Sequence, residues 1–230
     1  MSGQLFLIPT PIDEESPLEK CALDMLLKAC EKPDENIFII EDLKPGRRRW
    51  LRFGLPRERV ESFTLFNEHT RRDELPKIMS ALKSGKNAYI MSDGGLPAFC
   101  DPGVELVRSC HQENIRVSAS PFANSISLAL ALSGLDHNKF SFGGFLPIKD
   151  PERSEELKLL TQRRETLILM DTPYRMKKLL EEVQSLRLGR VCFLAMDLNC
   201  PSEELLYGKI EKIISKISDF KREFILILGA

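Results

Sequence analysis

AYIMSDGGLPAFCDPG, residues 88–103, is the stretch that indicates the fold most clearly. Its first residues, AYIM, form a short apolar run that predicts a buried strand. A loop rich in glycine and proline follows, and Asp101 with Pro102 predicts the start of a helix at about residue 103. A strand, a loop and a helix in this order are the repeating unit of a parallel α/β sheet.

The same unit recurs on the N-terminal side of this stretch. Strands are predicted from the apolar runs LFLIP (5–9), IFIIE (37–41) and FTLF (63–66). A helix over residues 17–30 is predicted from the capping signal at Ser16–Glu19, and another is predicted to follow Thr70, with Pro76 acceptable only near its first turn. Residues 1–118 are therefore expected to form an N-terminal α/β domain with a parallel sheet and crossover helices.

The second half of the chain continues the alternation with shorter connections. Strands are predicted at FSFGG, TLILM, RVCFLAMD, EELLYG and EFILILG, and helices at NSISLALALSG, after Asp150, after Thr172 and at KIEKIISKIS. Short connections favour antiparallel pairs, so residues 119–230 are expected to form a second α/β domain with a mixed sheet. The expected fold class is α/β, with two α/β domains.

Composition and charge exclude several classes of protein. Of the 230 residues, 43% are hydrophobic and 29% charged, as in an ordinary globular protein rather than a disordered chain. The longest apolar runs are far shorter than the ~20 residues of a membrane-spanning helix, and the N-terminus lacks the pattern of a signal peptide. We therefore expect a cytoplasmic protein without membrane contact. A net charge of −1 excludes a uniformly basic nucleic-acid binder, but not a local basic patch.

Ligand binding is expected beyond the carboxyl ends of the N-terminal strands, where loops and helix N-termini converge. The loops in those positions are residues 9–11, 41–42, 67–70 and 92–101. No GxGxxG or GxxxxGK[ST] motif occurs, which excludes the common dinucleotide and P-loop sites. His69, His111 and His137 are far apart in the sequence, so no metal site is predicted.

The loop after AYIM has two interpretations when it is taken alone. Gly94 and Gly95 permit close backbone approach, while Pro97 and Pro102 restrict the shape of the loop. Such a loop suits a bulky polar ligand, and it suits equally well a tight turn that joins a strand to a helix. Both interpretations stay open at this point.

Segments spread along the whole chain bear on this choice. In order, they read PTPIDE, EDLK, FNEHT, SDGGLPAFCDPG, PFANS, GFLP, MDTPYR, AMDL and FILILG. In order and spacing they resemble the tetrapyrrole methylase superfamily, most closely its branch that 2′-O-methylates a cytidine of small-subunit ribosomal RNA. The segments of that branch read ATPIGN, EDTR, YHEHN, SDAGTPGISDPG, PGPSA, GFLP, YESPHR and AREL, followed by a closing strand that ends in glycine.

The resemblance implies a methyltransferase that uses S-adenosyl-L-methionine, bound in a cleft between two domains, and that forms a homodimer. It also implies small-subunit ribosomal RNA, or the assembled subunit, as the partner. Carried over by position, the implied cofactor contacts are Ser92, Asp93, Gly94, Gly95, Leu96, Pro97, Phe99, Cys100, Asn124, Ser125, Met170, Ala195, Met196 and Leu198.

Several segments depart from the family pattern. PFANS lacks the glycine and second proline of PGPSA, EDLK lacks the threonine and arginine of EDTR, and Met196 replaces the arginine of AREL. The chain also ends directly after its last predicted strand. We therefore expect a divergent, short member of this branch, in which cofactor binding through backbone groups is better preserved than the acceptor site.

Methyl transfer to a ribose hydroxyl needs a base close to that hydroxyl. By loop position, Glu68 is the first candidate and His69 the second, while Asp93 is expected to bind the cofactor or orient its loop. The alternative is that Glu68 and His69 form a structural pair.

The clearest basic patch lies at GRRRWLRFGLPRER, residues 46–59. The residues proposed there to bind RNA phosphates are Arg47, Arg48, Arg49 and Arg52. Trp50 and Phe53 stand among them and could stack an unpaired base. The alternative is a solvated helix face with both aromatic rings in the core.

Two other functions remain open from the sequence. One is methylation of a tetrapyrrole or another small acceptor, which an apolar, aromatic cleft would favour. The other is an inactive binding or regulatory member of the fold, which the altered PFANS and AMDL segments suggest.

Overall fold

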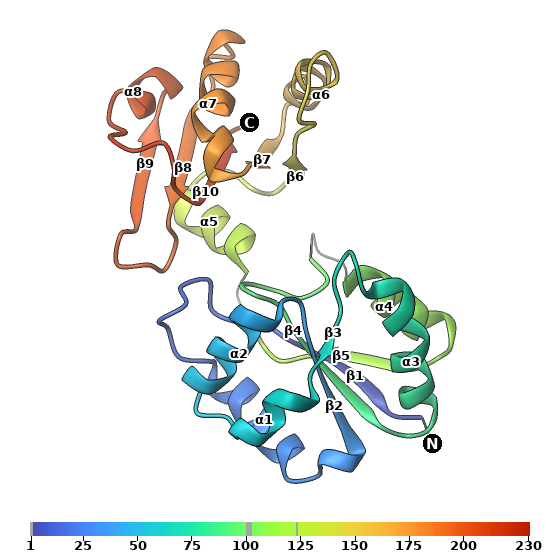
Figure 1. Cartoon of the computed structure of the whole chain (residues 1–230). Coiled ribbons are helices and arrows are strands. Elements are labelled where there is room, and N and C mark those ends of the chain that lie inside the picture. Colours follow the sequence, from blue (N-terminus) through green and yellow to red (C-terminus); the bar gives the residue numbers. More distant parts are fainter. Residues whose placement is uncertain (1, 100–102, 123) are drawn as a thin grey trace. The chain divides into compact units, whose positions relative to one another are not determined.

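The computed structural model describes residues 2–99, 103–122 and 124–230, and the chain divides into two compact units, Met1–Phe122 and Ala123–Ala230 (Figure 1). Each unit contains its own sheet and its own hydrophobic cores. The expected domain boundary at residue 118 lies inside strand β5 (Arg116–Ala119), whereas the division into units falls after that strand.

The first unit is built on a five-stranded parallel sheet with the strand order β3-β2-β4-β1-β5. Its strands are β1 (Gln4–Ile8), β2 (Asn36–Ile40), β3 (Thr64–Leu65), β4 (Asn87–Met91) and β5 (Arg116–Ala119). Met91 is in register with both Ile8 and Ile40, so β1, β2 and β4 end at the same level. The predicted parallel sheet is confirmed, and its carboxyl ends form one edge.

Helices cover both faces of this sheet (Figure 1). They are α1 (Lys20–Cys30), α2 (Leu43–Arg52), α3 (Arg71–Lys83) and α4 (Gly103–Gln112), with 3-10 turns at Pro33–Glu35 and Arg57–Ser62. Leu26 of α1 and Trp50 of α2 share one core with Phe38 of the sheet. Ile78 of α3 and Leu106 of α4 pack in a separate core. Two helices therefore cover each face.

Two predicted helix starts differ from the structure. Helix α1 begins at Lys20 rather than at residue 17, because the Ser16 hydroxyl donates to Asp13 (2.9 Å) instead of capping a helix. Thr70 precedes α3, but its hydroxyl donates to the Leu65 carbonyl (2.9 Å), and Pro76 lies beyond the first turn of the helix. The cap predicted at Asp101 and Pro102 falls outside the described residues.

The second unit contains a five-stranded mixed sheet with the order β6-β7-β10-β8-β9. Its strands are β6 (Phe140–Phe145), β7 (Thr166–Met170), β8 (Cys192–Met196), β9 (Glu204–Gly208) and β10 (Phe224–Leu228). Strands β6 and β7 pair in parallel, and the other neighbours pair antiparallel. The predicted mixed sheet is confirmed.

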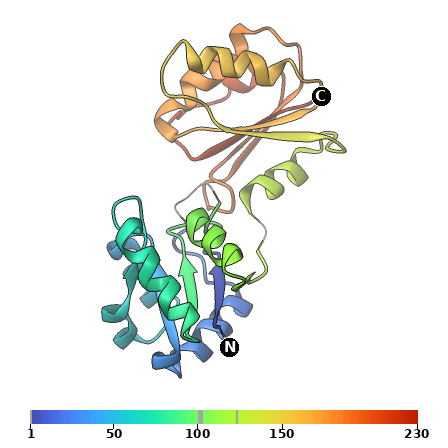
Figure 2. The ribbon, with the colours of Figure 1, turned by 90° about the vertical axis from the view of Figure 1, so that its right-hand side faces the viewer.

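The helices of the second unit lie on opposite sides of its sheet (Figure 2). They are α5 (Ser125–Ser133), α6 (Glu152–Thr161), α7 (Met176–Ser185) and α8 (Ile210–Ile214), with a 3-10 turn at Pro173–Arg175. Ala195 belongs to the core beneath α5, whereas Met196 belongs to the core beneath α6, α7 and α8. Adjacent residues of a strand point to opposite faces, which explains this separation. Within the described parts of both units, no helix has the length and apolar character that crossing a membrane requires.

Candidate functional site

The glycine loop, residues 92–97, follows β4 and is fixed to the loop that follows β1. The backbones of Thr10 and Gly95 exchange two hydrogen bonds of 2.9 Å. The buried Thr10 hydroxyl donates to the Ser92 carbonyl (3.0 Å), and the Ser92 hydroxyl donates to the Gly95 carbonyl (2.9 Å). Gly95 has a φ of 94°, which L side chains rarely adopt. These hydrogen bonds, within the loop and to Thr10, fix the shape of the loop, and Gly94 remains exposed.

Gly103, the first residue of α4, packs tightly against the end of this segment. A Cβ at residue 103 would lie 3.0 Å from the Ala98 nitrogen, so a larger residue would displace the backbone. Ala98 itself has a φ of 63°. The N-terminus of α4 consequently lies directly against the segment that follows the glycine loop.

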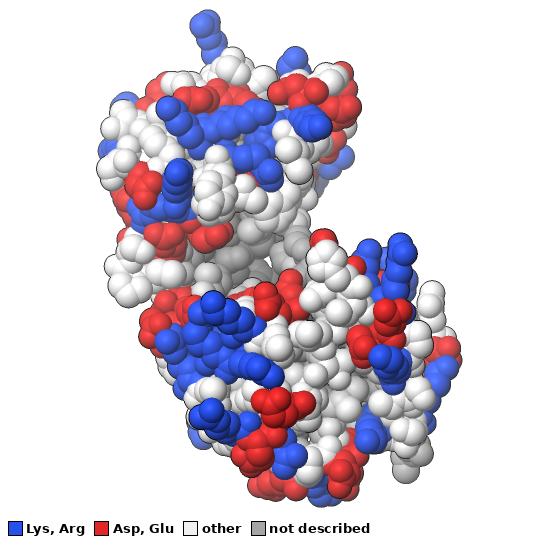
Figure 3. All heavy atoms as spheres, viewed as in Figure 1, with Lys and Arg blue, Asp and Glu red and all other residues white. Residues whose placement is uncertain are grey.

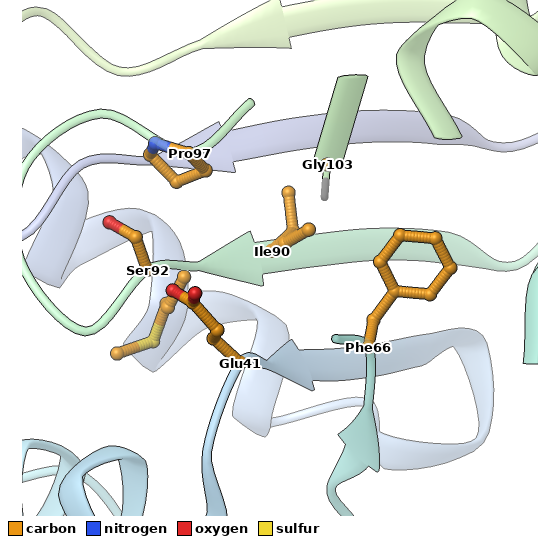
Figure 4. A pocket seen from close by; sticks show the side chains of 7 residues that line it. Glu41, Phe66, Ile90, Ser92, Pro97 and Gly103 are labelled. Carbon is orange, nitrogen blue, oxygen red and sulfur yellow. The ribbon is translucent and has the colours of Figure 1, made fainter. Parts of the chain in front are cut away.

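A hollow adjoins the glycine loop at the carboxyl ends of β2, β3 and β4. It is lined by Glu41, Phe66, Ile90, Met91, Ser92, Pro97 and Gly103. Figure 4 shows the oxygen atoms of Glu41 and Ser92 on one side and the Phe66 ring on the other. Its volume is about 10 Å³ for the centre of a water-sized sphere, roughly the space that one water molecule needs. The hollow alone is therefore far smaller than a small-molecule site.

Asp93 is the most strongly perturbed acid at this edge. Burial, followed by the charges of Glu41 and Asp42, raises the pKa of Asp93 from 3.8 to about 6, while Arg49 lowers it in part. One buried carboxylate oxygen, Oδ1, has no hydrogen-bond partner among the described residues. An ionised carboxylate with an unpaired buried oxygen can accept a hydrogen bond from a ligand. We refer to Glu41, Asp42 and Asp93 as the acidic edge.

Arg49 has a structural place in this site rather than a surface one. It is only 5% exposed, and its guanidinium group donates to the carbonyls of Pro11 (2.7 Å) and Ile12 (3.4 Å). The same group lies 3.4 Å from the position that a Cβ at Gly94 would take. Arg49 therefore anchors the loop after β1 beside the glycine loop, and it does not face solvent where an RNA phosphate could reach it.

Of the other arginines of α2, Arg48 and Arg52 are exposed and Arg47 is half-buried, and all three are paired. Arg48 forms an ion pair with Glu14, Arg52 with Glu15, and Arg47 with Glu61 (3.4 Å). Figure 3 shows the resulting mixture of basic and acidic side chains on the first unit, in the region where α2 lies in Figure 1. Two acidic residues of the loop after β1 are thus held by α2.

The predicted base-stacking role of Trp50 and Phe53 is wrong. Trp50 is completely buried, donates from Nε1 to the Pro56 carbonyl (2.8 Å), and packs edge-on against Phe38 at 5.0 Å between ring centroids. Phe53 is 7% exposed and belongs to the same core. Both rings lie on the core side of the helix, as the alternative interpretation of this segment expected.

Glu68 and His69 lie in the turn after β3, and both are exposed. Asn67 shapes this turn: its side-chain oxygen accepts from the His69 nitrogen (3.0 Å), and its amide donates to the Glu41 carbonyl (3.0 Å). Within residues 2–99, 103–122 and 124–230, neither the Glu68 nor the His69 side chain has a hydrogen bond or ion pair, so the structural pair that was the alternative interpretation does not form. The turn is nevertheless tied to the acidic edge.

The predicted site residues of the second unit lie at the start of α5, at the ends of β7 and β8, and just after β8. Asn124 accepts a hydrogen bond from the Ser127 nitrogen (2.9 Å) and caps α5, which begins at Ser125. Met170 ends β7. Met170, Ala195 and Leu198 contribute to the core beneath α5. Met196 does not join them, because its side chain is buried in the opposite core. Of the other predicted contacts, Leu96 is half-buried, Phe99 is exposed, and Cys100 lies outside the described residues.

Two residues that shape the site were not singled out from the sequence. Thr10 fixes the glycine loop, and Phe66 forms one wall of the hollow. Thr10 lies in the loop of residues 9–11 that the sequence places at the ligand-binding edge, and Phe66 ends the apolar run FTLF; these positions are the signals that point to them. In the part of the chain that the structure describes, no group of three or more His, Cys, Asp or Glu residues is placed to hold a metal ion.

The sequence is similar to known proteins over almost its whole length. The model of the family Tetrapyrrole (Corrin/Porphyrin) Methylases matches residues 22–214. A Bacillus subtilis protein named Ribosomal RNA small subunit methyltransferase I is 30% identical over 228 residues, which cover 98% of this chain and 75% of that protein. A Thermotoga maritima protein of the same name is 30% identical over 213 residues, with coverages of 93% and 91%.

Solved structures share the fold at low sequence identity. A diphthine synthase superposes with a TM-score of 0.68 and 11% identity, covering 100% of this chain and 90% of that one. A uroporphyrin-III C-methyl transferase from Thermus thermophilus, complexed with S-adenyl homocysteine, gives a TM-score of 0.59 and 16% identity, with coverages of 99% and 97%. The family resemblance and the fold class expected from the sequence are both confirmed.

Proposed function

The chain belongs to the tetrapyrrole (corrin/porphyrin) methylases, and on that basis we propose that it transfers a methyl group from S-adenosyl-L-methionine to small-subunit ribosomal RNA. The proposed acceptor is the 2′-hydroxyl of a cytidine. The observation that carries the acceptor class is the similarity, over 98% of the chain, to Ribosomal RNA small subunit methyltransferase I. The glycine loop and the acidic edge are the features that support S-adenosyl-L-methionine as the proposed cofactor.

The residues of the first unit fit S-adenosyl-L-methionine. The exposed Gly94 leaves its backbone accessible to a ligand, and Asp93 has a buried oxygen without a partner among the described residues. Gly95, whose own backbone groups bond to Thr10, holds the loop in this shape. The acidic edge complements a cofactor that carries a sulfonium and an ammonium group. The proposed contacts in this unit are Ser92, Asp93, Gly94, Gly95, Leu96, Pro97, Phe99 and Cys100.

The proposed cofactor contacts of the second unit rest on the family resemblance. They are Asn124, Ser125, Met170, Ala195, Met196 and Leu198. Because the Met196 side chain is buried in the other core, only its backbone is proposed to take part. When bound, S-adenosyl-L-methionine supplies an electrophilic methyl group, and the chain has to orient the acceptor and exclude water.

We propose Glu68 as the base that accepts the proton of the ribose hydroxyl, with His69 as the second candidate. Their exposed turn is tied through Asn67 to Glu41 at the rim of the hollow, which supports a role at this edge. Glu68→Gln is expected to reduce turnover roughly 10²- to 10⁴-fold while cofactor affinity, measured calorimetrically, stays unchanged. Full turnover by this variant would refute the assignment.

Arg47, Arg48 and Arg52 are the proposed phosphate contacts on α2, without Arg49. Their side chains are 39%, 51% and 33% exposed, which leaves part of each side chain accessible. Alanine at these positions should weaken RNA binding and make its dependence on salt concentration shallower. An unchanged salt dependence would exclude this surface.

The decisive experiment for the function is methyl transfer to purified small ribosomal subunits from a strain that lacks the gene. Labelled S-adenosyl-L-methionine should label one cytidine, and mapping should find the methyl group on its ribose. Transfer to a tetrapyrrole but not to the subunit, or no binding of the cofactor, would overturn the proposal.

We further infer a cytoplasmic homodimer. Ribosomal subunits supply the acceptor in that compartment, and the family resemblance supports the dimer. Analytical ultracentrifugation should give twice the chain mass of 26.2 kDa. A monomer at the concentrations of the activity assay would contradict the inferred assembly.

A further inference from the structure

Two loops at one edge of the second sheet are tied together by a buried ion network. Phe145 and Met170 are in register at the ends of the parallel strands β6 and β7, so the loops that follow them start at the same level. Arg153 of α6 is completely buried and donates to the Pro147 carbonyl of the first loop (3.1 Å). Its Nη2 lies 2.9 Å from Asp171 of the second loop, in an ion pair without hydrogen-bond geometry.

The same network fixes the turn Pro173–Arg175. Asp171 Oδ1 accepts hydrogen bonds from the Thr172 nitrogen (2.8 Å) and from Arg175 Nε (2.6 Å). The Arg175 nitrogen also donates to the Thr172 carbonyl (2.9 Å). Burying a charged group lowers the free energy of unfolding unless the group is well paired. The buried charges of Arg153 and Asp171 are used here to fix this short turn.

Tyr174 projects from the fixed turn into solvent. Its exposure of 84% is the highest among the large hydrophobic residues identified as exposed, and Ile148 of the tied neighbouring loop is 68% exposed. The Lys221 ammonium group lies 6.0 Å from the centroid of the Tyr174 ring. Among the residues that the structure describes, Lys221 has no ion pair. Strand β10 begins at this same edge, because its Ile225 is in register with Met170, and Lys221 lies just before it.

Two more lysines follow Tyr174 in the sequence, and both pair with acids. In the first turn of α7, Lys177 lies 3.9 Å from Glu181, and Lys178 lies 3.5 Å from Asp150. Figure 3 shows basic and acidic side chains together on the face of the second unit where α6 and α7 lie in Figure 1. An exposed ring on a fixed turn, beside an ammonium group without an ion pair among the described residues, is a combination that binds single-stranded nucleic acid, since the ring stacks a base and the cation contacts a phosphate. A duplex offers no base face to such a ring.

We infer that Tyr174 stacks an unpaired base of the RNA acceptor and that Lys221 contacts the adjoining phosphate. This inference rests on the proposed function. It assigns to the second unit a stacking platform, residues 147–148 and 171–175, that compensates for the burial of Trp50 and Phe53 in the first unit. The platform lies at the sheet edge that also carries Met170, so a stacked base is held near a proposed cofactor contact.

The test compares single substitutions that spare every proposed cofactor residue. Tyr174→Ala removes the ring, Tyr174→Phe keeps its face, and Lys221→Gln removes the charge. Tyr207→Ala is the matched control: Tyr207 is also exposed, at 59%, but it pairs with Phe193 near the other end of the sheet. Binding is measured with a labelled single-stranded RNA of roughly 10 nucleotides, with the same sequence as a duplex, and with S-adenosyl-L-methionine by calorimetry.

Tyr174→Ala should weaken single-strand binding roughly 5- to 100-fold, while Tyr174→Phe stays within about twofold of wild type. Lys221→Gln should lower the salt slope for the single strand by about 0.7. Duplex and cofactor affinities should not change in the Tyr174 variants, and Tyr207→Ala should bind as wild type does.

If the wild-type protein binds RNA and Tyr174→Ala binds it with the same affinity, the platform is refuted and the proposed function stands. An equal loss in Tyr174→Ala and Tyr207→Ala would overturn it as well, because it would indicate a general effect of removing tyrosine. If the wild-type protein binds neither RNA nor ribosomal subunits, the proposed function fails together with the platform.

Discussion

Replacing Arg153 by methionine should reduce the free energy of unfolding of the second unit by about 3 kcal/mol. The Arg153 and Asp171 side chains are both 0% exposed, and breaking a buried pair by removing one partner costs roughly 3 to 5 kcal/mol. Arg175 stays bound to Asp171 at 2.6 Å, and Glu182 is 22% exposed, so both remaining acids keep some compensation. The lower end of the range is therefore expected.

Urea unfolding measures this loss, and the chain provides a probe for each unit. Its one tryptophan, Trp50, lies in the core of the first unit, so its fluorescence reports that unit. Far-ultraviolet circular dichroism reports both. Arg153→Met should shift the dichroism transition to lower urea and leave the fluorescence midpoint unchanged.

Two controls separate the buried pair from general surface effects. Lys178→Met removes an exposed partner of Glu182 (3.6 Å) and should cost less than about 1 kcal/mol. Arg153→Met combined with Asp171→Asn should be less destabilised than Arg153→Met alone, because the amide leaves no buried negative charge while its oxygen can still accept from the Thr172 nitrogen and Arg175. A wild-type dichroism transition in Arg153→Met, or a double variant as unstable as the sum of the single ones, would refute the reasoning.

Three further predictions concern the first unit and are measured by tryptophan fluorescence in urea. The folded-state pKa of Asp93 is raised to about 6, so the ionised carboxylate lowers the free energy of unfolding at neutral and higher pH. Asp93→Asn should therefore raise the free energy of unfolding by about 1 to 3 kcal/mol at pH 8. This gain should disappear as the pH falls from 6 towards 4. A gain that grows towards low pH would contradict the assigned direction. Gly95→Ala should lower the free energy of unfolding by about 1 to 2 kcal/mol, because an alanine is strained at a φ of 94°. Gly94→Ala should change it by less than about 0.5 kcal/mol. Equal effects of the two substitutions would refute the strain assigned to position 95. Arg49→Leu should cost about 1 to 3 kcal/mol by leaving two carbonyls unpaired, and Arg48→Ala less than about 1 kcal/mol; the reverse order would exclude Arg49 as the anchor.

The sheets could be predicted because each strand is a local feature of the sequence. Runs such as AYIM and TLILM carry enough apolar surface to be buried wherever the chain places them. Helix starts were less predictable, since they depend on competition for one side chain. The Ser16 hydroxyl could have capped a helix, and Asp13 takes it instead.

The roles of the α2 arginines could not be predicted, because their partners are distant in the sequence. Arg49 bonds to a carbonyl 38 positions away, and Arg48 pairs with an acid 34 positions away. A run of arginines in a sequence has the same appearance whether it faces RNA or holds a loop. The position of Met196 illustrates the same limit: a match to a family motif gives its place on β8, but the pleat of the strand decides which core receives the side chain.

The arginines in the exposed ion pairs of α2 would have to bind both the acids of the loop after β1 and an RNA phosphate. Arg48 and Arg52 hold Glu14 and Glu15, and a polyanion arriving at α2 would compete with those acids for the same guanidinium groups. Contact with RNA at this helix would therefore loosen the segment that follows the Thr10 attachment, while the buried bonds of Arg49 would keep it from detaching. Natural variants that lose Glu14 or Glu15 would free basic charge for the acceptor and give up order in the loop beside the glycine turn.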